Sequence, residues 1–89
     1  MYVKATKVLI EKGIHARPSA KIVEYVLSKK ETHVWIEYPQ KNRQGNADSV
    51  LELLMLEVTS GDTVVIKAEG KDEKEVATYI SHILETFKV

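Results

Sequence analysis

Residues 8–27 read VLIEKGIHARPSAKIVEYVL, and within this stretch the sequence changes from a strand-like to a helix-like pattern. The apolar run 8–10 precedes Gly13, which can adopt backbone angles that are strained for other residues and so suits a chain reversal. Pro18 is tolerated in the first turn of a helix, because its missing N–H would have no partner there. We therefore expect a turn at Gly13 and a helix from about Ala16 to Ser28, with His15 just ahead of it.

The residues around His15 would lie where this helix begins, which is a favourable place for an anion. The first N–H groups of a helix have no internal partners and carry the positive end of the macrodipole. A phosphoryl group on the His15 imidazole would face the N–H groups of Ala16 and Arg17, and the Arg17 guanidinium would add charge-assisted hydrogen bonds. The alternative is a histidine that only caps the helix or lies on the surface. No acid is placed to orient His15, so a hydrolase triad is not indicated.

Periodicity predicts the other elements outward from this stretch. Strands are expected at 2–10, 32–38, 45–47 and 63–69, and helices at 49–57 and from Asp72 onward. Within 32–38, Val34, Ile36 and Tyr38 alternate with polar or aromatic neighbours, as in a half-buried strand. The order βαββαβα predicts an α+β fold in one domain, residues 1–89, with an antiparallel sheet covered by helices on one face.

Two further helix starts carry cap signals. Ser49 followed by Glu52 fits a capping box, in which each side chain bonds the backbone N–H of the other residue, although Asp48 or Asn46 could serve as the cap instead. Asp72 stands in the same position before the last helix. The apolar stripes expected to face the sheet are Ile22, Val23, Val26 and Leu27 in the first helix and Val76, Ala77, Ile80, Ile83, Leu84 and Phe87 in the last.

Composition excludes several classes of function. Thirteen basic and thirteen acidic residues cancel, so no net field attracts nucleic acid or an anionic membrane, and no aromatic-rich strand of the RNA-binding type is present. The chain has no cysteine and therefore no disulfide or thiolate metal site. His33 and His82 lack a metal-ligand spacing with His15, and we expect them to be exposed to solvent. We expect no metal, no cofactor and no membrane insertion, and a cytoplasmic location.

Two segments resemble the signatures of a known family. GIHARPSA at residues 13–20 is similar to the active-site signature of the HPr family, the histidine phosphocarriers of the bacterial phosphoenolpyruvate-dependent phosphotransferase system. NADSVLELLML at residues 46–56 resembles the family's second signature, around its regulatory serine. The Gly61-Asp62 turn and the acidic start of the last helix follow the same pattern. The resemblance implies an open-faced β-sandwich, in which a four-stranded antiparallel sheet is covered on one face by three helices.

The resemblance also implies a carrier rather than an enzyme. Enzyme I would phosphorylate His15 on Nδ1, Arg17 would help to hold the phosphoryl oxygens, and an enzyme IIA domain would receive the group. Ser49 lies at the position of the regulatory serine, which an ATP-dependent HPr kinase phosphorylates in many bacteria. Glu52 stands where many members have glycine, and its carboxylate would repel a phosphate on Ser49. The alternative for Ser49 is a helix cap and nothing more.

The second helix is too apolar for its length to bury every side chain. We expect Leu51 and Met55, four residues apart, to lie exposed near His15 and to dock partners, the alternative being that both belong to the core. The run 53–56 resembles the nitrogen-regulatory paralogues, so sugar transport and regulation through protein binding both stay open. A monomer is expected for a shuttle that presents one face to successive partners.

Overall fold

The computed structural model describes residues 1–88, and its elements follow the predicted order. The strands are β1 (Tyr2–Lys7), β2 (Thr32–Tyr38), β3 (Arg43–Asn46) and β4 (Thr63–Gly70), and the helices are α1 (Ala16–Ser28), α2 (Val50–Met55) and α3 (Glu73–Thr86), with a short 3-10 turn η1 (Pro39–Lys41) before β3. The predicted bounds of α1 and β2 are confirmed.

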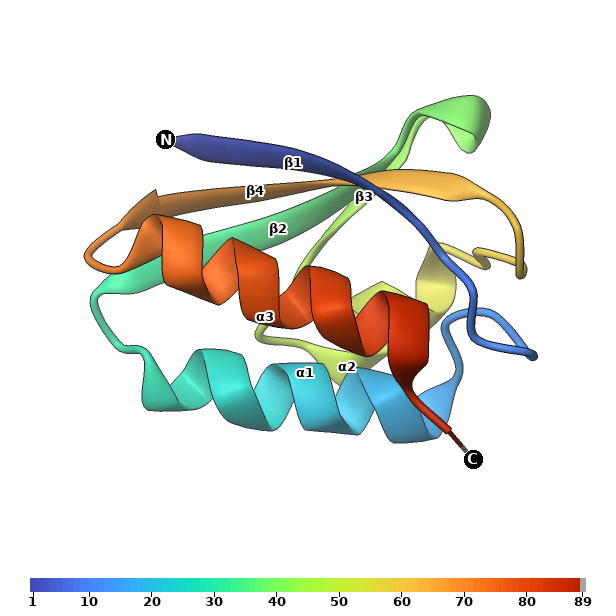
Figure 1. Cartoon of the computed structure of the whole chain (residues 1–89), viewed down its shortest axis with the longest axis horizontal. Coiled ribbons are helices and arrows are strands. Elements are labelled where there is room, and N and C mark those ends of the chain that lie inside the picture. The colour runs from blue at the N-terminus through green and yellow to red at the C-terminus, as the bar shows by residue number, and fades with distance from the viewer. Residues whose placement is uncertain (89) are drawn as a thin grey trace.

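The four strands form one antiparallel sheet in the order β1-β4-β2-β3. Val34 pairs with Ala68 and Ile36 with Ile66, so the side chains of the two central strands that face the helices meet in register. All four of these side chains are buried, as is Tyr38, which confirms the predicted alternation of β2. Figure 1 shows the sheet as one layer with α1 and α3 below it on the same side.

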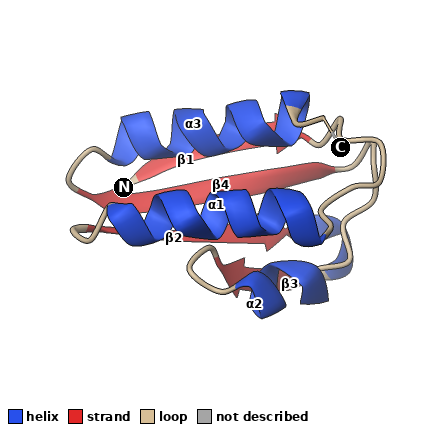
Figure 2. Cartoon of the chain, turned by 90° about the horizontal axis from the view of Figure 1, so that it is seen from below, coloured by secondary structure: helices blue, strands red, loops and turns tan. Residues whose placement is uncertain are grey.

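The core lies between the sheet and the helices. Figure 2 shows α1 and α3 running along the same face of the sheet, with the shorter α2 beside α1. Burying one aliphatic side chain stabilises a fold by about 1.5–3 kcal/mol, so the apolar helix faces supply most of the force that holds the layers together. The fully buried large side chains come from every layer and from the loops: Val8, Ile10, Ile22, Val34, Ile36, Tyr38, Leu53, Leu56, Val64, Ile66, Ile80 and Leu84.

The first strand is shorter than predicted, because the chain changes partners after Val8. The N–H of Val8 donates to the carbonyl of Asp62 at 2.8 Å, and the N–H of Leu9 donates to the carbonyl of Leu84 at 3.0 Å, at the end of α3. Val8 and Ile10 are buried all the same. Their apolar character therefore reports burial in a loop and not a continued strand.

The caps at the starts of α2 and α3 differ from the predicted ones. Ser49 caps α2, since its Oγ accepts the Glu52 N–H at 3.2 Å, but the Glu52 carboxylate accepts the N–H of Asn46 at 2.9 Å, so the capping box is not reciprocal. Asp72 precedes α3 in a left-handed conformation (φ 61°) and its side chain makes no cap hydrogen bond, so that predicted cap is wrong. The second helix is also shorter than 49–57, because Glu57 turns to positive φ.

Leu27 is not part of the buried stripe of α1. It is 57% exposed, whereas Ile22, Val23 and Val26 are buried. One residue is 100° of helical rotation, which carries Leu27 past the edge of the face that Val26 buries. The stripe predicted for α3 is confirmed for its five buried members, and Phe87 lies just after the helix, partly buried against the core.

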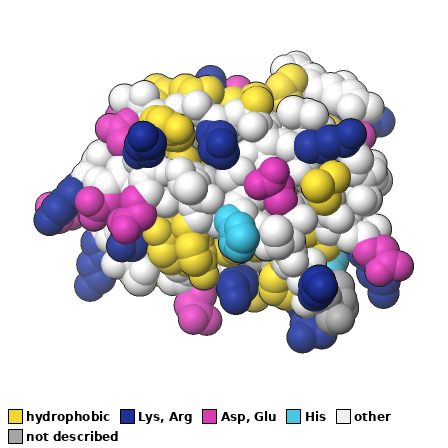
Figure 3. All heavy atoms as spheres, in the orientation of Figure 1, with side chains coloured by type: hydrophobic (Ala, Val, Ile, Leu, Met, Phe, Trp, Pro, Cys, Tyr) yellow, Lys and Arg dark blue, Asp and Glu magenta, His cyan; other side chains and the backbone are white. Residues whose placement is uncertain are grey.

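The surface over α1 and α3 is mixed in charge. Figure 3 shows basic and acidic side chains interspersed over this face, in keeping with a net charge of zero. Within residues 1–88, no helix has the length and apolar character that crossing a membrane requires. No group of three or more histidine or acidic side chains in the same range is arranged to hold a metal ion.

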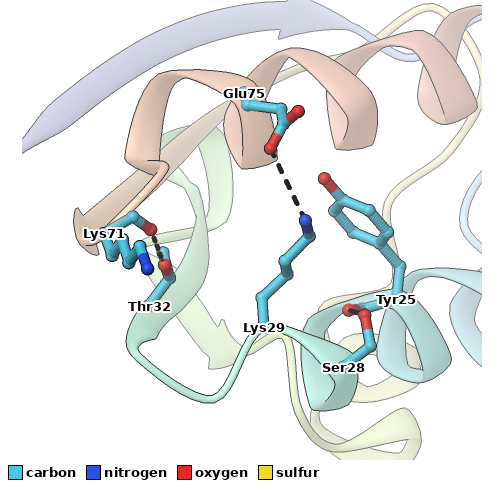
Figure 4. Close-up of polar contacts among 6 residues, drawn as sticks. All are labelled: Tyr25, Ser28, Lys29, Thr32, Lys71 and Glu75. Carbon is cyan, nitrogen blue, oxygen red and sulfur yellow. Dashed lines mark hydrogen bonds and ion pairs between the residues drawn. The ribbon is translucent and has the colours of Figure 1, made fainter.

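The C-terminal end of α1 is tied to α3 by a separate set of contacts. Lys29 pairs with Glu75 at 3.5 Å, and the Thr32 hydroxyl donates to the Lys71 carbonyl (Figure 4). The Tyr25 ring stacks on Tyr79 with the centroids 3.9 Å apart. These contacts lie at the opposite end of α1 from His15, so they fix the helix without occupying its start.

Candidate functional site

His15 is the residue from which α1 begins. It has an extended backbone (φ −111°, ψ −171°) and its side chain makes no hydrogen bond to the helix. The prediction that His15 lies just ahead of the helix is therefore confirmed, and Pro18 lies in the first turn, as predicted. The first turn of α1 contains no acidic residue.

The loop before His15 is held against the segment that follows α2. Gly13 has φ 68°, and a Cβ on it would overlap the carbonyl oxygen of Val58. The N–H of Ile14 donates to that same carbonyl at 3.2 Å, and the N–H of Gly13 donates to Ile10 at 2.9 Å. A glycine is needed at this position because the chain both turns and approaches a neighbouring backbone.

The start of α1 presents donors toward any group bound on His15. The N–H of Ser19 donates to the His15 carbonyl at 3.1 Å, which is the first bond of the helix. Pro18 has no N–H, and the N–H groups of Ala16 and Arg17 come too early to have a carbonyl partner within α1. Both of these residues are exposed. The backbone donors and the Arg17 guanidinium therefore belong to one short exposed segment that suits an anion.

The His15 imidazole is half-buried and its two nitrogens are in different environments. Nε2 is buried and has no hydrogen-bond partner in the described structure. The ring packs edge-on against Phe87, with centroids 6.4 Å apart and planes at 71°. Nε2 is therefore not accessible to a group from outside.

Phe87 was not identified as a site residue from the sequence. The sequence pattern assigned it to the apolar stripe of the last helix, and nothing in that pattern connects it to residue 15. The contact arises because the chain end leaves α3 toward the start of α1, as both ribbon views show (Figures 1 and 2).

Leu51 and Met55 form an apolar surface on α2, which we call the α2 surface. They are 67% and 64% exposed, whereas Leu53 between them is fully buried. The core alternative is therefore excluded for both residues. α2 packs against α1, and in both ribbon views it lies toward the end of α1 where His15 begins the helix.

Ser49 is partly buried and acts as an acceptor at the start of α2. Its Oγ takes the Glu52 N–H, and the Glu52 carboxylate turns to the Asn46 N–H. Asn46 in turn bonds the ring of His33 through its side-chain oxygen, at 3.1 Å from Nε2. The structure thus gives Ser49 a capping role and brings Glu52 into the same local network.

The other aromatic and histidine residues lie away from His15. His33 and Trp35 project from β2 on the open face of the sheet, with ring centroids 5.1 Å apart. Trp35 donates to Glu37, and Lys67 contacts the same carboxylate at 2.9 Å, so Lys67 first and Trp35 second hold the pKa of Glu37 below its ordinary value. His33 and His82 are exposed, as predicted.

Asp62 lies at the end of the loop between α2 and β4, which also contains Val58, and its carboxylate accepts two hydrogen bonds there. The hydroxyl of Tyr38 donates to its carboxylate, and the hydroxyl of Thr59 does so at 2.8 Å. These two bonds, the Tyr38 bond foremost, hold the pKa of Asp62 below its ordinary value. The bond to Asp62 first, and burial second, raise the pKa of Tyr38. The loop that receives the Ile14 N–H is therefore fixed partly by an ionised carboxylate.

Comparison with known proteins places these features in a family. A family model described as "PTS HPr component phosphorylation site" matches residues 3–86. The chain is 36% identical over 77 residues to the phosphocarrier protein HPr of Mycoplasma pneumoniae, covering 86% of this chain and 85% of that protein. It is 35% identical over 77 residues to the phosphocarrier protein NPr of Proteus mirabilis, covering 83% and 80%. The crystal structure of HPr-C-His from Thermoanaerobacter tengcongensis superimposes with a TM-score of 0.82 at 32% identity, covering 96% of this chain and 92% of that one.

Proposed function

Because the chain belongs to the HPr family of phosphotransferase-system phosphocarriers, we propose that His15 accepts a phosphoryl group from enzyme I and passes it to an enzyme IIA domain. The observation that carries this proposal is the start of α1, where the His15 side chain makes no cap hydrogen bond and the residue remains partly exposed. A nucleophilic nitrogen therefore stands beside backbone donors that have no partner within the helix.

The transfer needs only one bond to form and one to break. The lone pair of Nδ1 attacks the phosphorus of phospho-enzyme I, the bond from phosphorus to the donor breaks, and its electron pair returns to the donor. The oxygens then face the N–H groups of Ala16 and Arg17 and the Arg17 guanidinium. Because these groups lie in water, they stabilise the phosphohistidine only modestly, and the group can pass on in the reverse of the same step.

The direct test is labelling. The protein is incubated with phosphoenolpyruvate and enzyme I, and mass spectrometry follows one acid-labile phosphoryl group. We expect a single group on the wild type and none on His15→Ala. Absence of labelling under conditions that charge a control HPr would contradict the proposal.

The α2 surface is the proposed docking site for both enzyme I and enzyme IIA. Leu51 and Met55 are exposed apolar side chains on the helix next to α1, and methionine adapts to more than one partner. Leu51→Glu should slow labelling by enzyme I and leave the fold intact. Leu27→Glu is the matched control, because Leu27 is a similarly exposed leucine in the last turn of α1. Equal labelling rates for the two variants would exclude the α2 surface.

Regulation by an HPr kinase/phosphorylase through Ser49 is a further part of the proposal. A phosphate on Ser49 would lie at the positive end of α2, but close to Glu52, whose N–H the hydroxyl now accepts. A cognate kinase with ATP should add one acid-stable phosphate to the wild type and none to Ser49→Ala. If no phosphate is added, or if Ser49→Ala still takes it, Ser49 is a cap alone.

A role in nitrogen regulation is the second candidate. The similarity to the NPr of Proteus mirabilis favours it, and the similarity to the HPr of Mycoplasma pneumoniae favours the more general HPr assignment. Transfer of the labelled group to a sugar-specific or to a nitrogen-type enzyme IIA, compared by rate, separates the two.

A further inference from the structure

Two buried polar atoms at the start of α1 have no hydrogen-bond partner, and both belong to residues of its first turn. One is Nε2 of His15 and the other is Oγ of Ser19, a residue with no exposed surface. Buried polar groups are nearly always partnered in folded proteins, and an exception calls for an explanation. Here two exceptions occur four residues apart.

The helix connects the two residues directly. The N–H of Ser19 donates to the His15 carbonyl at 3.1 Å, so the backbones of the two residues are joined across the first turn of α1. The other buried residues of α1 are Pro18, Ile22, Val23 and Val26, which offer no polar side-chain atom. An alanine would fill the Ser19 position without burying a hydroxyl, so the oxygen itself calls for a role.

Resting on the proposed function, we propose that Ser19 is a positioning residue whose hydroxyl oxygen accepts the N–H of His15 Nε2 and so selects the tautomer that reacts at Nδ1. A neutral imidazole carries one N–H, and the nitrogen without it holds the lone pair. Attack through Nδ1 therefore needs the proton on Nε2. With this bond the two unpartnered buried atoms would satisfy each other.

The hydroxyl has the right chemistry to act as the acceptor. A serine hydroxyl oxygen carries two lone pairs, and in the described structure neither is engaged, so one is available for the Nε2–H. When Nδ1 forms its bond to phosphorus, Nε2 keeps its proton and the ring takes up a positive charge, while the electron pair of the broken bond stays on the donor. The bond from Nε2–H to Ser19 thereby strengthens as the phosphoryl group arrives.

The test reads the tautomer directly in the unphosphorylated protein. Nitrogen-15 NMR of the imidazoles at alkaline pH, where the rings are neutral, gives the ratio of the two tautomers of His15. We expect the Nε2–H form to predominate in the wild type, and its ratio to the Nδ1–H form to fall about threefold to tenfold in Ser19→Ala, the usual effect of one hydrogen bond. Labelling by enzyme I should slow by a similar factor.

Two variants serve as controls. Ser28→Ala makes the same change at the other end of α1, where the hydroxyl donates to the Tyr25 carbonyl, and it should leave the His15 ratio unchanged. Ser19→Thr keeps the hydroxyl and should restore the wild-type ratio. If the threonine variant does not fold, the Nε2–H proton signal decides: it should be visible in the wild type and broadened by exchange in Ser19→Ala. An unchanged ratio in Ser19→Ala would overturn the inference.

The tautomer measurement uses neither enzyme I nor phosphoenolpyruvate. If wild-type labelling fails while the ratio shifts in Ser19→Ala, the proposed function is wrong and the link between Ser19 and His15 stands. If labelling succeeds on His15 and the ratio does not move, the carrier function stands and Ser19 has no part in positioning the ring.

Discussion

The two neighbouring helices α1 and α2 begin in opposite ways. α1 begins at His15, whose side chain makes no cap, so the N–H groups of Ala16 and Arg17 have no partner within the helix. α2 begins at Ser49, whose Oγ accepts the N–H of Glu52. The first N–H groups of α1 therefore have no side-chain partner, whereas one of the first N–H groups of α2 is bonded by the Ser49 side chain.

The difference shows how one fold separates binding from stability. A side-chain cap stabilises a helix by about 1 kcal/mol, but it occupies the donors that an anion would use. The start of α1 lacks that stabilisation and keeps its donors available. The start of α2 has the stabilisation, and its apolar residues Leu51 and Met55 lie exposed beyond the cap.

His15→Ser would remove this difference, and it should have the largest effect. Serine is a good N-cap, so unfolding in urea should show a gain of up to about 1 kcal/mol in the free energy of unfolding. Labelling by enzyme I should fall below detection, because no imidazole remains. A stable variant that still accepts an acid-labile phosphoryl group would contradict the contrast between the two helix starts.

Gly13→Ala should disturb how the start of α1 is held against the segment after α2. The added Cβ would overlap the Val58 carbonyl oxygen at a residue with φ 68°, so we expect a loss of about 2–3 kcal/mol in urea unfolding. Gly61→Ala is the matched control, because Gly61 also has positive φ (96°) but has nothing within 4 Å of the added atom. Its loss should be about 1 kcal/mol, and equal losses would mean that the close approach at Val58 is unimportant.

Ser49→Ala removes the side-chain cap of α2 and tests the comparison at the second helix start. Losing the bond to the Glu52 N–H should lower the free energy of unfolding by about 1 kcal/mol, measured in urea. Labelling of His15 should not change. A variant as stable as the wild type would show that Ser49 contributes no cap energy.

Acid should destabilise the loop after α2 that contains Val58 and Asp62 and that binds the Ile14 N–H. This is the smallest of the four expected effects. The pKa of Asp62 is held low in the folded state by Tyr38 and Thr59, so its contribution to stability is present above the ordinary Asp pKa of about 3.9 and is lost as the pH falls through the folded value. In thermal unfolding across this range, Asp62→Asn and Tyr38→Phe should both flatten the decline below that pH. If either variant loses stability with falling pH as steeply as the wild type does, the bond from Tyr38 to Asp62 is not the source of the acid sensitivity.

The secondary structure was largely predictable because its signals are local. The alternation of 32–38 and the proline near the start of 16–28 each report a backbone geometry that neighbouring residues enforce, and both elements have the predicted bounds. The errors occur where a distant segment provides the partner. The first strand does not continue to residue 10, because Leu9 bonds Leu84 of α3 instead of the segment that precedes β4.

The candidate site also has a part that local sequence signals predicted and a part that depends on distant segments. The sequence alone placed His15 at the start of a helix, because glycine, proline and the apolar period fix a turn and a helix start within a few residues. It also predicted an exposed position for Leu51 and Met55, because a short and very apolar helix cannot bury every side chain, and both are exposed.

Only the tertiary structure decided the surroundings of the His15 ring. Phe87 reaches it from the far end of the chain, and the packed interior isolates Nε2 and the Ser19 hydroxyl from water. Burial of this kind depends on segments more than 70 residues apart in sequence, and local periodicity carries no information about which of them will meet. The sequence thus determined which residue stands at the open helix start, and the packing of the layers decided that Nε2 of its ring is buried.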